Sequence, residues 1–291
     1  MSLSFSPFDN YNGHYRWYYV DVSGDDFCAV AIFMLGAVFS PAAWRAARSG
    51  HLPLSHCAVN FAFYQGGKRR AWVFSTYEGA MLSGDTLRIG ASQMRYTDNS
   101  LDIDIDDRQA PRGKAVRARF TLEATAPASP VIALDDTRHA WRVLAPRARA
   151  TLDFSGHHAG VGYHDMNWGT EPLGGGLAGW RWSRVHGQAS SDIVFDLGRE
   201  AIRVTAADTQ TSVTREAAPR PALARSAWGL PLPTTIGSLP VGQTLESSPF
   251  YARLAATSAG THAIAEVADF RRFGASRFRW MAHFRQRQGA R

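Results

Sequence analysis

Short runs of β-branched and aromatic residues, separated by turns rich in Gly, Ser and Asp, recur along almost the whole chain. Such runs are typical of β-strands, and many of them with almost no helix indicate a barrel or a sandwich. The predicted strands cover residues 15–22, 28–39, 57–64, 71–76, 101–105, 116–122, 139–144, 148–154, 178–186, 250–256, 262–270 and 277–284. We therefore expect an all-β protein made of antiparallel β-barrel or β-sandwich domains.

One short helix is expected among these strands, over residues 40–50. Ser40 suits the N-cap position, Pro41 suits the first turn, and Gly50 is a typical stop. Between them lie good helix formers, mainly alanine and arginine.

The chain of 291 residues is long enough for two modest domains, each with its own core. Residues 124–130 are small and include two prolines, which is typical of a linker. We place a boundary there, giving an N-terminal β domain (1–128) and a C-terminal β domain (129–291). Residues 217–240 are rich in Pro, Gly and Ala and indicate a long loop or lid.

Charge and hydropathy bear on location and partners. The longest apolar run, residues 27–39, is too short to span a membrane, and the N-terminus lacks the features of a signal peptide, so a cytoplasmic protein is expected. The net charge of +7 comes almost entirely from arginine and would favour anionic surfaces. The C-terminal arginines alternate with apolar residues as on a solvated strand. We predict no nucleic-acid partner and no obligate protein partner, and leave peripheral contact with a membrane surface open.

The segment 162–169 has an unusual alternation of side chains. As a strand it places Tyr163, Asp165 and Asn167 on one face, and His164 and Trp168 on the other. An acid on a buried face must be paired, hydrogen-bonded or kept neutral by a raised pKa, and a neutral acid can donate a proton. The alternative is a turn in which the Asp and Asn side chains bond the backbone before Gly169.

Other kinds of site find little support. His157 and His158 lie near His164 in the sequence, but no H-E-x-x-H motif or paired-cysteine spacing accompanies them. The run 174–176 of three glycines is not followed by the Lys-Ser/Thr of a phosphate-binding loop, and no G-x-S-x-G motif is present. We therefore predict no metal and no cofactor.

The segment 162–169 resembles the signature of the carotenoid 1,2-hydratases, also called hydroxyneurosporene synthases. Further blocks resemble this family in the same order along the chain, at residues 15–19, 36–41, 58–64, 139–141 and 248–253. The resemblance implies two lipocalin-like β domains with the site between them. It also implies an apolar polyene or isoprenoid as the substrate and no cofactor.

Hydration of an isoprenoid terminus requires an acid that protonates the alkene, tolerance of a tertiary cation, and water that adds to it. The resemblance implies that Asp165 is the proton donor, with Trp141, Tyr163 and Trp168 as rings that stabilise the cation. His139 or Tyr163 would hold the acid or the water. The implied catalytic residues are His139, Trp141, Tyr163 and Asp165. The implied substrate-binding residues are Trp17, Asn60, Asn167, Trp168, Glu171 and Trp180.

The sequence also departs from the family pattern. Residues 72–78 stand where the family tends to carry an acidic and basic pair, and Gly174 replaces an acidic residue after Pro-Leu. Two alternatives therefore stay open. One is a lipocalin-like polyene cyclase or pericyclase of the Diels-Alderase type, in which Asp165 orients the substrate. The other is a non-catalytic carrier of an apolar ligand.

Overall fold

The computed structural model describes residues 13–37, 39–49, 55–97, 100–110, 112–135, 138–174, 176–207, 209–275 and 286–289. Within them the fold is almost entirely β, with two short helices, α1 (Pro41–Arg48) and α2 (Phe270–Gly274). The predicted helix after Ser40 is confirmed. The second helix was not predicted and is capped by Asp269, whose side chain accepts a hydrogen bond from the Arg272 N–H. The predicted strand 277–284 lies outside the described residues.

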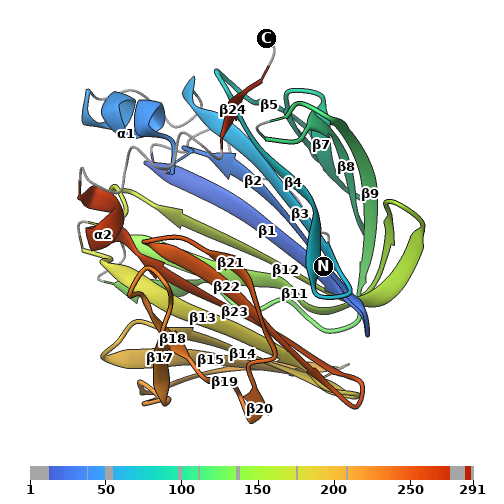
Figure 1. Cartoon of the computed structure of the whole chain (residues 1–291), viewed down its shortest axis with the longest axis vertical. Helices are drawn as coiled ribbons and strands as arrows, with labels where there is room; N and C mark the ends of the chain where they lie inside the picture. The colour runs from blue at the N-terminus through green and yellow to red at the C-terminus, as the bar shows by residue number, and fades with distance from the viewer. Residues whose placement is uncertain are drawn as a thin grey trace.

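Within the described residues, the larger sheet contains thirteen strands, and of their pairings only that between β24 and β4 is parallel. Its strands run in the order β24 (Arg287–Gln288), β4 (Lys68–Tyr77), β3 (Cys57–Gln65), β2 (Phe27–Leu35), β1 (Tyr15–Ser23), β12 (His157–Gly169), β11 (His139–Asp153), β9 (Ala115–Ala124), β8 (Ser100–Arg108), β7 (Ser92–Tyr96), β6 (Thr86–Ile89) and β5 (Met81–Ser83), while β10 (Ile132–Asp135) pairs with β11. Figure 1 shows how β5–β9 curl over toward β3 and β4 to make a half-barrel.

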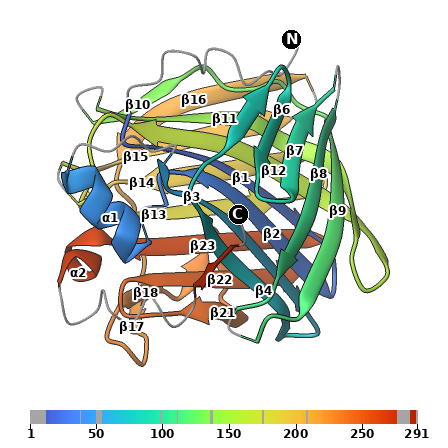
Figure 2. The same cartoon turned by 90° about the horizontal axis from the view of Figure 1, so that it is seen from above.

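The smaller sheet contains seven antiparallel strands and lies against the half-barrel on its β1–β12 side (Figure 1). Its order is β16 (Gln210–Ala217), β15 (Glu200–Ala207), β14 (Ser190–Asp196), β13 (Gly179–His186), β23 (Thr261–Asp269), β22 (Tyr251–Ser258) and β21 (Gln243–Ser247). Figure 2 shows the strands of the two sheets crossing one above the other.

The segment 217–240 forms two small hairpins rather than an irregular loop. They are β17 (Leu223–Arg225) with β18 (Pro231–Pro233), and β19 (Thr235–Ile236) with β20 (Leu239–Pro240). Leu230, Leu232 and Ile236 pack against the outer face of β22 and β23. No residue of the segment lines the cavity described below.

Within the described residues, three large cores follow from the alternation of side chains along the strands, and Phe250 and Phe273 form a small fourth cluster. One fills the inside of the half-barrel and includes Phe33, Phe61 and Phe120. A second, rich in aromatic rings, lies between the two sheets, and the third lies under the two hairpins. Strands β1, β2 and β3 of the larger sheet contribute to two cores, one on each face. Both faces of these strands are therefore buried and largely apolar.

A buried ion pair also joins the sheets. Arg184 on β13 donates from Nε to Asp21 Oδ1 on β1 at 2.9 Å and from its terminal nitrogen to Ser23 Oγ at 2.6 Å. Neither charged side chain is exposed. Loss of one partner would leave a buried charge unpaired, which is strongly destabilising.

The predicted domain division after residue 128 stays a prediction. In terms of sheets, the chain passes from one to the other between β12 and β13, because β11 and β12 continue the larger sheet. No helix within the described residues has the length and apolar character needed to cross a membrane.

Candidate functional site

The two faces of β12 point into different cores, as the alternation of segment 162–169 predicts. Asp165 and Asn167 face the smaller sheet and line a cavity there. His164 faces the half-barrel, where it accepts a hydrogen bond from the Tyr96 hydroxyl at 2.6 Å and donates from Nδ1 to the Tyr19 carbonyl at 2.9 Å. Burial lowers the pKa of His164 to about 4, so its ring is neutral and structural at neutral pH.

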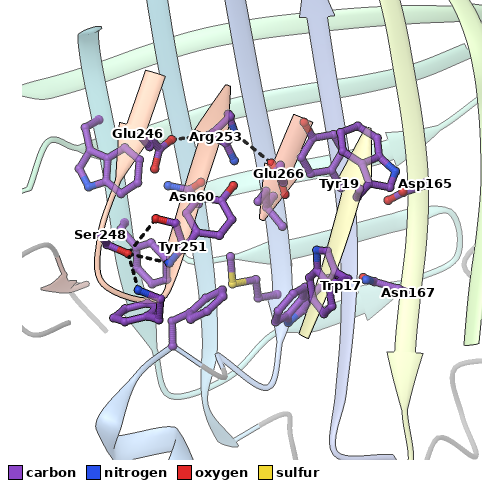
Figure 3. Close-up of a pocket in the computed structure, with 18 of the residues that line it drawn as sticks. Trp17, Tyr19, Asn60, Asp165, Asn167, Glu246, Ser248, Tyr251, Arg253 and Glu266 are labelled. Atoms are coloured by element: carbon purple, nitrogen blue, oxygen red, sulfur yellow. Dashed lines mark hydrogen bonds and ion pairs between the residues drawn. The ribbon is translucent and has the colours of Figure 1, made fainter. Parts of the chain in front are cut away.

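The cavity lies between the sheets and is lined mainly by aromatic and aliphatic side chains (Figure 3). Its volume is about 110 Å³. The aromatic side chains that line it include Trp17, Tyr19, Phe39, Phe74, Trp180 and Trp182. Besides Asp165 and Asn167, its polar lining includes Asn60 on the larger sheet, and Glu246, Ser248, Tyr251, Arg253 and Glu266 on the smaller sheet and its β21–β22 turn.

Asp165 is the acid of the larger-sheet wall. Its Oδ2 accepts hydrogen bonds from Trp141 Nε1 at 2.8 Å and from the Tyr163 hydroxyl at 2.7 Å. Trp141 lies opposite Asn167 in the β11–β12 register, so its indole reaches Asp165 diagonally across the strands. Burial raises the pKa of Asp165 to about 7, against the lowering effect of these two hydrogen bonds.

The hydrogen bonds also decide which oxygen carries the proton. Both donors point at Oδ2 of Asp165, and no described residue hydrogen-bonds Oδ1. A neutral carboxylic acid keeps one oxygen as an acceptor and protonates the other. The proton of Asp165 therefore belongs on Oδ1, and about half of the molecules carry it near pH 7.

His139 lies away from Asp165. It is opposite Gly169 in the register, four residues along β12, which is about 13 Å at the usual rise of a strand. Tyr15 donates a hydrogen bond to its Nδ1 at 3.0 Å, and Nε2 lies 3.3 Å from Glu171 Oε1. A Cβ at Gly169 would meet His139 Nδ1 at 2.4 Å, so the glycine makes room for this ring.

The remaining predicted residues divide between the cavity and other places. Trp17, Asn60 and Trp180 line the cavity with Asp165 and Asn167. Trp168 lies on the opposite face of β12, where the Arg16 guanidinium stands 5.9 Å from its ring centre. Glu171 lies outside the cavity too, and holds Arg138 at 3.1 Å as well as His139. Trp141 and Tyr163 stand behind Asp165, so the rings that face a ligand belong to other residues.

The sequence did not single out the charged groups on the smaller-sheet wall. Arg253 on β22 forms ion pairs with Glu246 on β21 and with Glu266 on β23, the latter at 2.9 Å from Nε to Oε1. Tyr64 also donates to Glu246. All three charged side chains are buried. Figure 3 shows them in a row across the cavity, with Glu266 at the end toward Asp165.

Among the described residues, no three His, Cys, Asp or Glu side chains come together as metal ligands would.

The fold and the site define a class: two stacked, almost wholly antiparallel sheets that enclose an aromatic-walled cavity with a buried acid, Asp165, on one wall. Within this class the chain belongs to the carotenoid hydratase family, because the family model of the carotenoid hydratase CrtC matches residues 31–290. The resemblance seen in the sequence is thereby confirmed.

Named relatives agree with this placement. The acyclic carotenoid 1,2-hydratase of Thiocapsa roseopersicina is 32% identical, and that of Rubrivivax gelatinosus is 33% identical; in each case the match covers 83% of this chain and 64% of the relative. The acyclic carotenoid 1,2-hydratase of Cereibacter sphaeroides is 30% identical, over 83% of this chain and 92% of the relative. The chain thus spans slightly less than two thirds of the length of the first two relatives.

Solved structures support the expected all-β, lipocalin-like fold. A protein assigned as AttH from Nitrosomonas europaea superposes with a TM-score of 0.60 at 15% identity, covering 92% of this chain and 97% of the other. CghA, solved with Sch210972, superposes with a TM-score of 0.51 at 9% identity, covering 89% of each chain. At such identities the likeness concerns the fold alone.

Proposed function

We propose that the protein is a cofactor-free hydratase that adds water to the terminal double bond of an acyclic carotenoid or a similar isoprenoid polyene. The observation that carries the proposal is a buried carboxylic acid, Asp165, in an aromatic cavity, with a pKa raised to about 7. Membership of the carotenoid hydratase family supports the substrate class.

The first step is proton transfer from Asp165 to the less substituted carbon of the terminal alkene. The π electrons form the new C–H bond, and the adjacent carbon becomes a tertiary cation. A general acid acts best when its pKa is near the working pH, and such catalysis contributes roughly 10² to 10⁴ in rate. Trp141 and Tyr163 stabilise the carboxylate that remains, because both donate hydrogen bonds to it.

The tertiary cation needs aromatic faces rather than polar groups that would capture it. Tyr19 lies beside Asp165 in the β1–β12 register, and its ring centre is 5.3 Å from that of Trp182 on the facing sheet. Both line the cavity. Each such ring contributes about 0.5 to 2 kcal/mol toward a desolvated cation.

The size of the cavity determines how a long substrate binds. A volume of about 110 Å³ is well below that of pockets that enclose a drug-sized ligand. Only the end of a polyene chain fits beside Asp165, and the remaining chain extends outward. Since such a substrate partitions into lipid, the proposal includes peripheral contact with a membrane surface, which cosedimentation with lipid vesicles would test.

Isotope labelling tests the reaction type. In H₂¹⁸O, a hydratase yields an alcohol that carries the label. A product with the mass of the substrate would instead indicate a polyene cyclase or isomerase, and unchanged substrate would indicate a carrier. Either of these results would overturn the proposal.

Replacement of the acid tests the assignment of Asp165. Asp165→Asn keeps an acceptor for Trp141 and Tyr163 but has no proton to give, so turnover should fall by about 10² or more while substrate still binds. Asp107→Asn is the matched control, because Asp107 is also a buried acid bonded by two hydroxyls, those of Ser75 and Tyr77, but lies outside the cavity. Equal losses in both variants would refute the role of Asp165.

A further inference from the structure

Glu266 lies on the smaller-sheet wall of the cavity, across from Asp165. It pairs with Trp182 in the β13–β23 register, and the Trp182 ring centre is 5.3 Å from that of Tyr163, the hydrogen-bond partner of Asp165. Figure 3 shows the Glu266 carboxylate next to Tyr19, with Asp165 beyond that ring. The charge of Glu266 is close enough to contribute to the raised pKa of Asp165. The two carboxyl groups therefore face the same small volume from opposite walls.

Glu266 is held in place by the buried guanidinium of Arg253. Arg253 Nε donates to its Oε1, and the Tyr251 hydroxyl also interacts with the carboxylate. Arg253 also pairs with Glu246, so the three groups together carry a net charge of −1 when all are ionised. A negative wall favours a cation that forms in the cavity.

Two buried tyrosine hydroxyls lie near Glu266. Neither meets the geometry of a standard hydrogen bond, but that of Tyr251 interacts with Glu266 and that of Tyr19 with Asp21. Both tyrosines line the cavity. Glu266 lies close to the Tyr251 hydroxyl, since it raises the pKa of that phenol in addition to the effect of burial. A hydroxyl can both donate and accept, so these two groups and the Glu266 carboxylate together make a polar position on this side of the cavity that suits a water molecule.

We propose that Glu266 is a second catalytic residue, which binds the water that attacks the cation and accepts a proton from that water. Tyr251 and Tyr19 orient the water, and Arg253 positions the carboxylate. The inference rests on the hydratase function proposed above and divides the reaction between the two sheets. The acid is on β12 and the base is on β23.

The proton balance closes without a further reactant. Asp165 loses its proton to the alkene, and a water oxygen forms the C–O bond to the tertiary carbon. One O–H bond of that water breaks, and its proton passes to Glu266. Release of this proton to solvent and uptake of one by Asp165 restore both groups. The sum is one alkene and one water giving one tertiary alcohol.

The test compares Glu266→Gln with Glu246→Gln. Each variant removes one of the two carboxylates that pair with Arg253, so both leave it with one partner. The reaction is run in D₂O at a pH of about 5.5, where Asp165, with a pKa of about 7, is protonated. Alcohol formation and deuterium in the recovered substrate are both measured by mass spectrometry.

We expect Glu266→Gln to lower alcohol formation by about 10² or more while deuterium still enters the recovered substrate. The cation would form from Asp165 and collapse back to alkene because water capture is slow. Glu246→Gln should lose less than about tenfold, because Glu246 lines the cavity at the end of the charged row that is farther from Asp165 (Figure 3).

Similar losses in the two variants, or a Glu266→Gln variant that makes alcohol at the wild-type rate, would overturn the role of Glu266. If Glu266→Gln unfolds, Glu266→Ala with added formate takes its place, and failure of formate to restore any alcohol formation counts against a base at this position. Absence of alcohol from the wild-type protein would refute the proposed function itself, which keeps the two failures distinct.

Discussion

Asp165→Asn should make the protein more stable at alkaline pH while it removes activity. The pKa of Asp165 rises from 3.8 in a solvated chain to about 7 in the fold, because burial disfavours the carboxylate. Between these two pH values the folded protein keeps the proton that the unfolded chain has released. The contribution of Asp165 to the free energy of unfolding therefore falls as the pH rises through this window, and is constant above it.

A shift of roughly three units at about 1.4 kcal/mol per unit makes this loss about 4 kcal/mol. An asparagine does not titrate, and its carbonyl oxygen can accept both bonds from Trp141 and Tyr163. The wild-type protein should thus lose about 4 kcal/mol relative to Asp165→Asn between pH 4 and pH 8.

Urea unfolding of both proteins at several pH values measures this difference, and groups that titrate alike in both cancel. Nearly parallel stability profiles for the two proteins would refute the reasoning. They would mean that Asp165 is ionised at neutral pH and is no proton donor.

Two further predictions concern activity. Trp141→Phe removes a hydrogen bond that lowers the pKa of Asp165, so this pKa should rise. The alkaline limb of the profile of kcat against pH, which lies near pH 7 in the wild type, should then move to higher pH. An alkaline limb that stays in place or moves to lower pH would contradict this. Trp180→Ala removes a ring that lines the cavity and should raise KM about tenfold. Trp168→Ala, on the face of β12 that points away from the cavity, should change KM little. Equal changes in KM in steady-state kinetics of the two variants would refute the placement of the site.

The strand pattern predicted the fold class and the wall that carries the acid. The alternation of segment 162–169 is enough to separate Asp165 from His164, since a strand has a strict period of two. His139 was expected near Asp165 because it shares a face with Trp141. That expectation required the register between β11 and β12, which sets His139 opposite Gly169 and which periodicity alone does not give.

The charged wall could not be predicted from the sequence. Arg253 and Glu266 stand opposite each other on β22 and β23, but an exposed cross-strand pair such as Arg119 with Asp104 has the same sequence pattern. Only the stacking of the second sheet on the first buries one pair and leaves the other in water. The blocks shared with the hydratase family included Arg253 and gave the one available signal.

The two faces of β12 serve different parts of the molecule, the cavity and the inside of the half-barrel. A change in the number of residues in this strand therefore disturbs the structure more than most substitutions would. One residue deleted ahead of Tyr163 would move Asp165 to the position of His164, beside Tyr96 inside the half-barrel. One residue inserted there would move His164 to the position of Asp165 in the cavity. Insertions should therefore accumulate among homologues in the turns that flank β12, while the strand itself keeps a constant number of residues. Substitutions in β12 that keep Asp165, its partner Tyr163 and the close-packed Gly169 should therefore be tolerated better than any change in the number of residues.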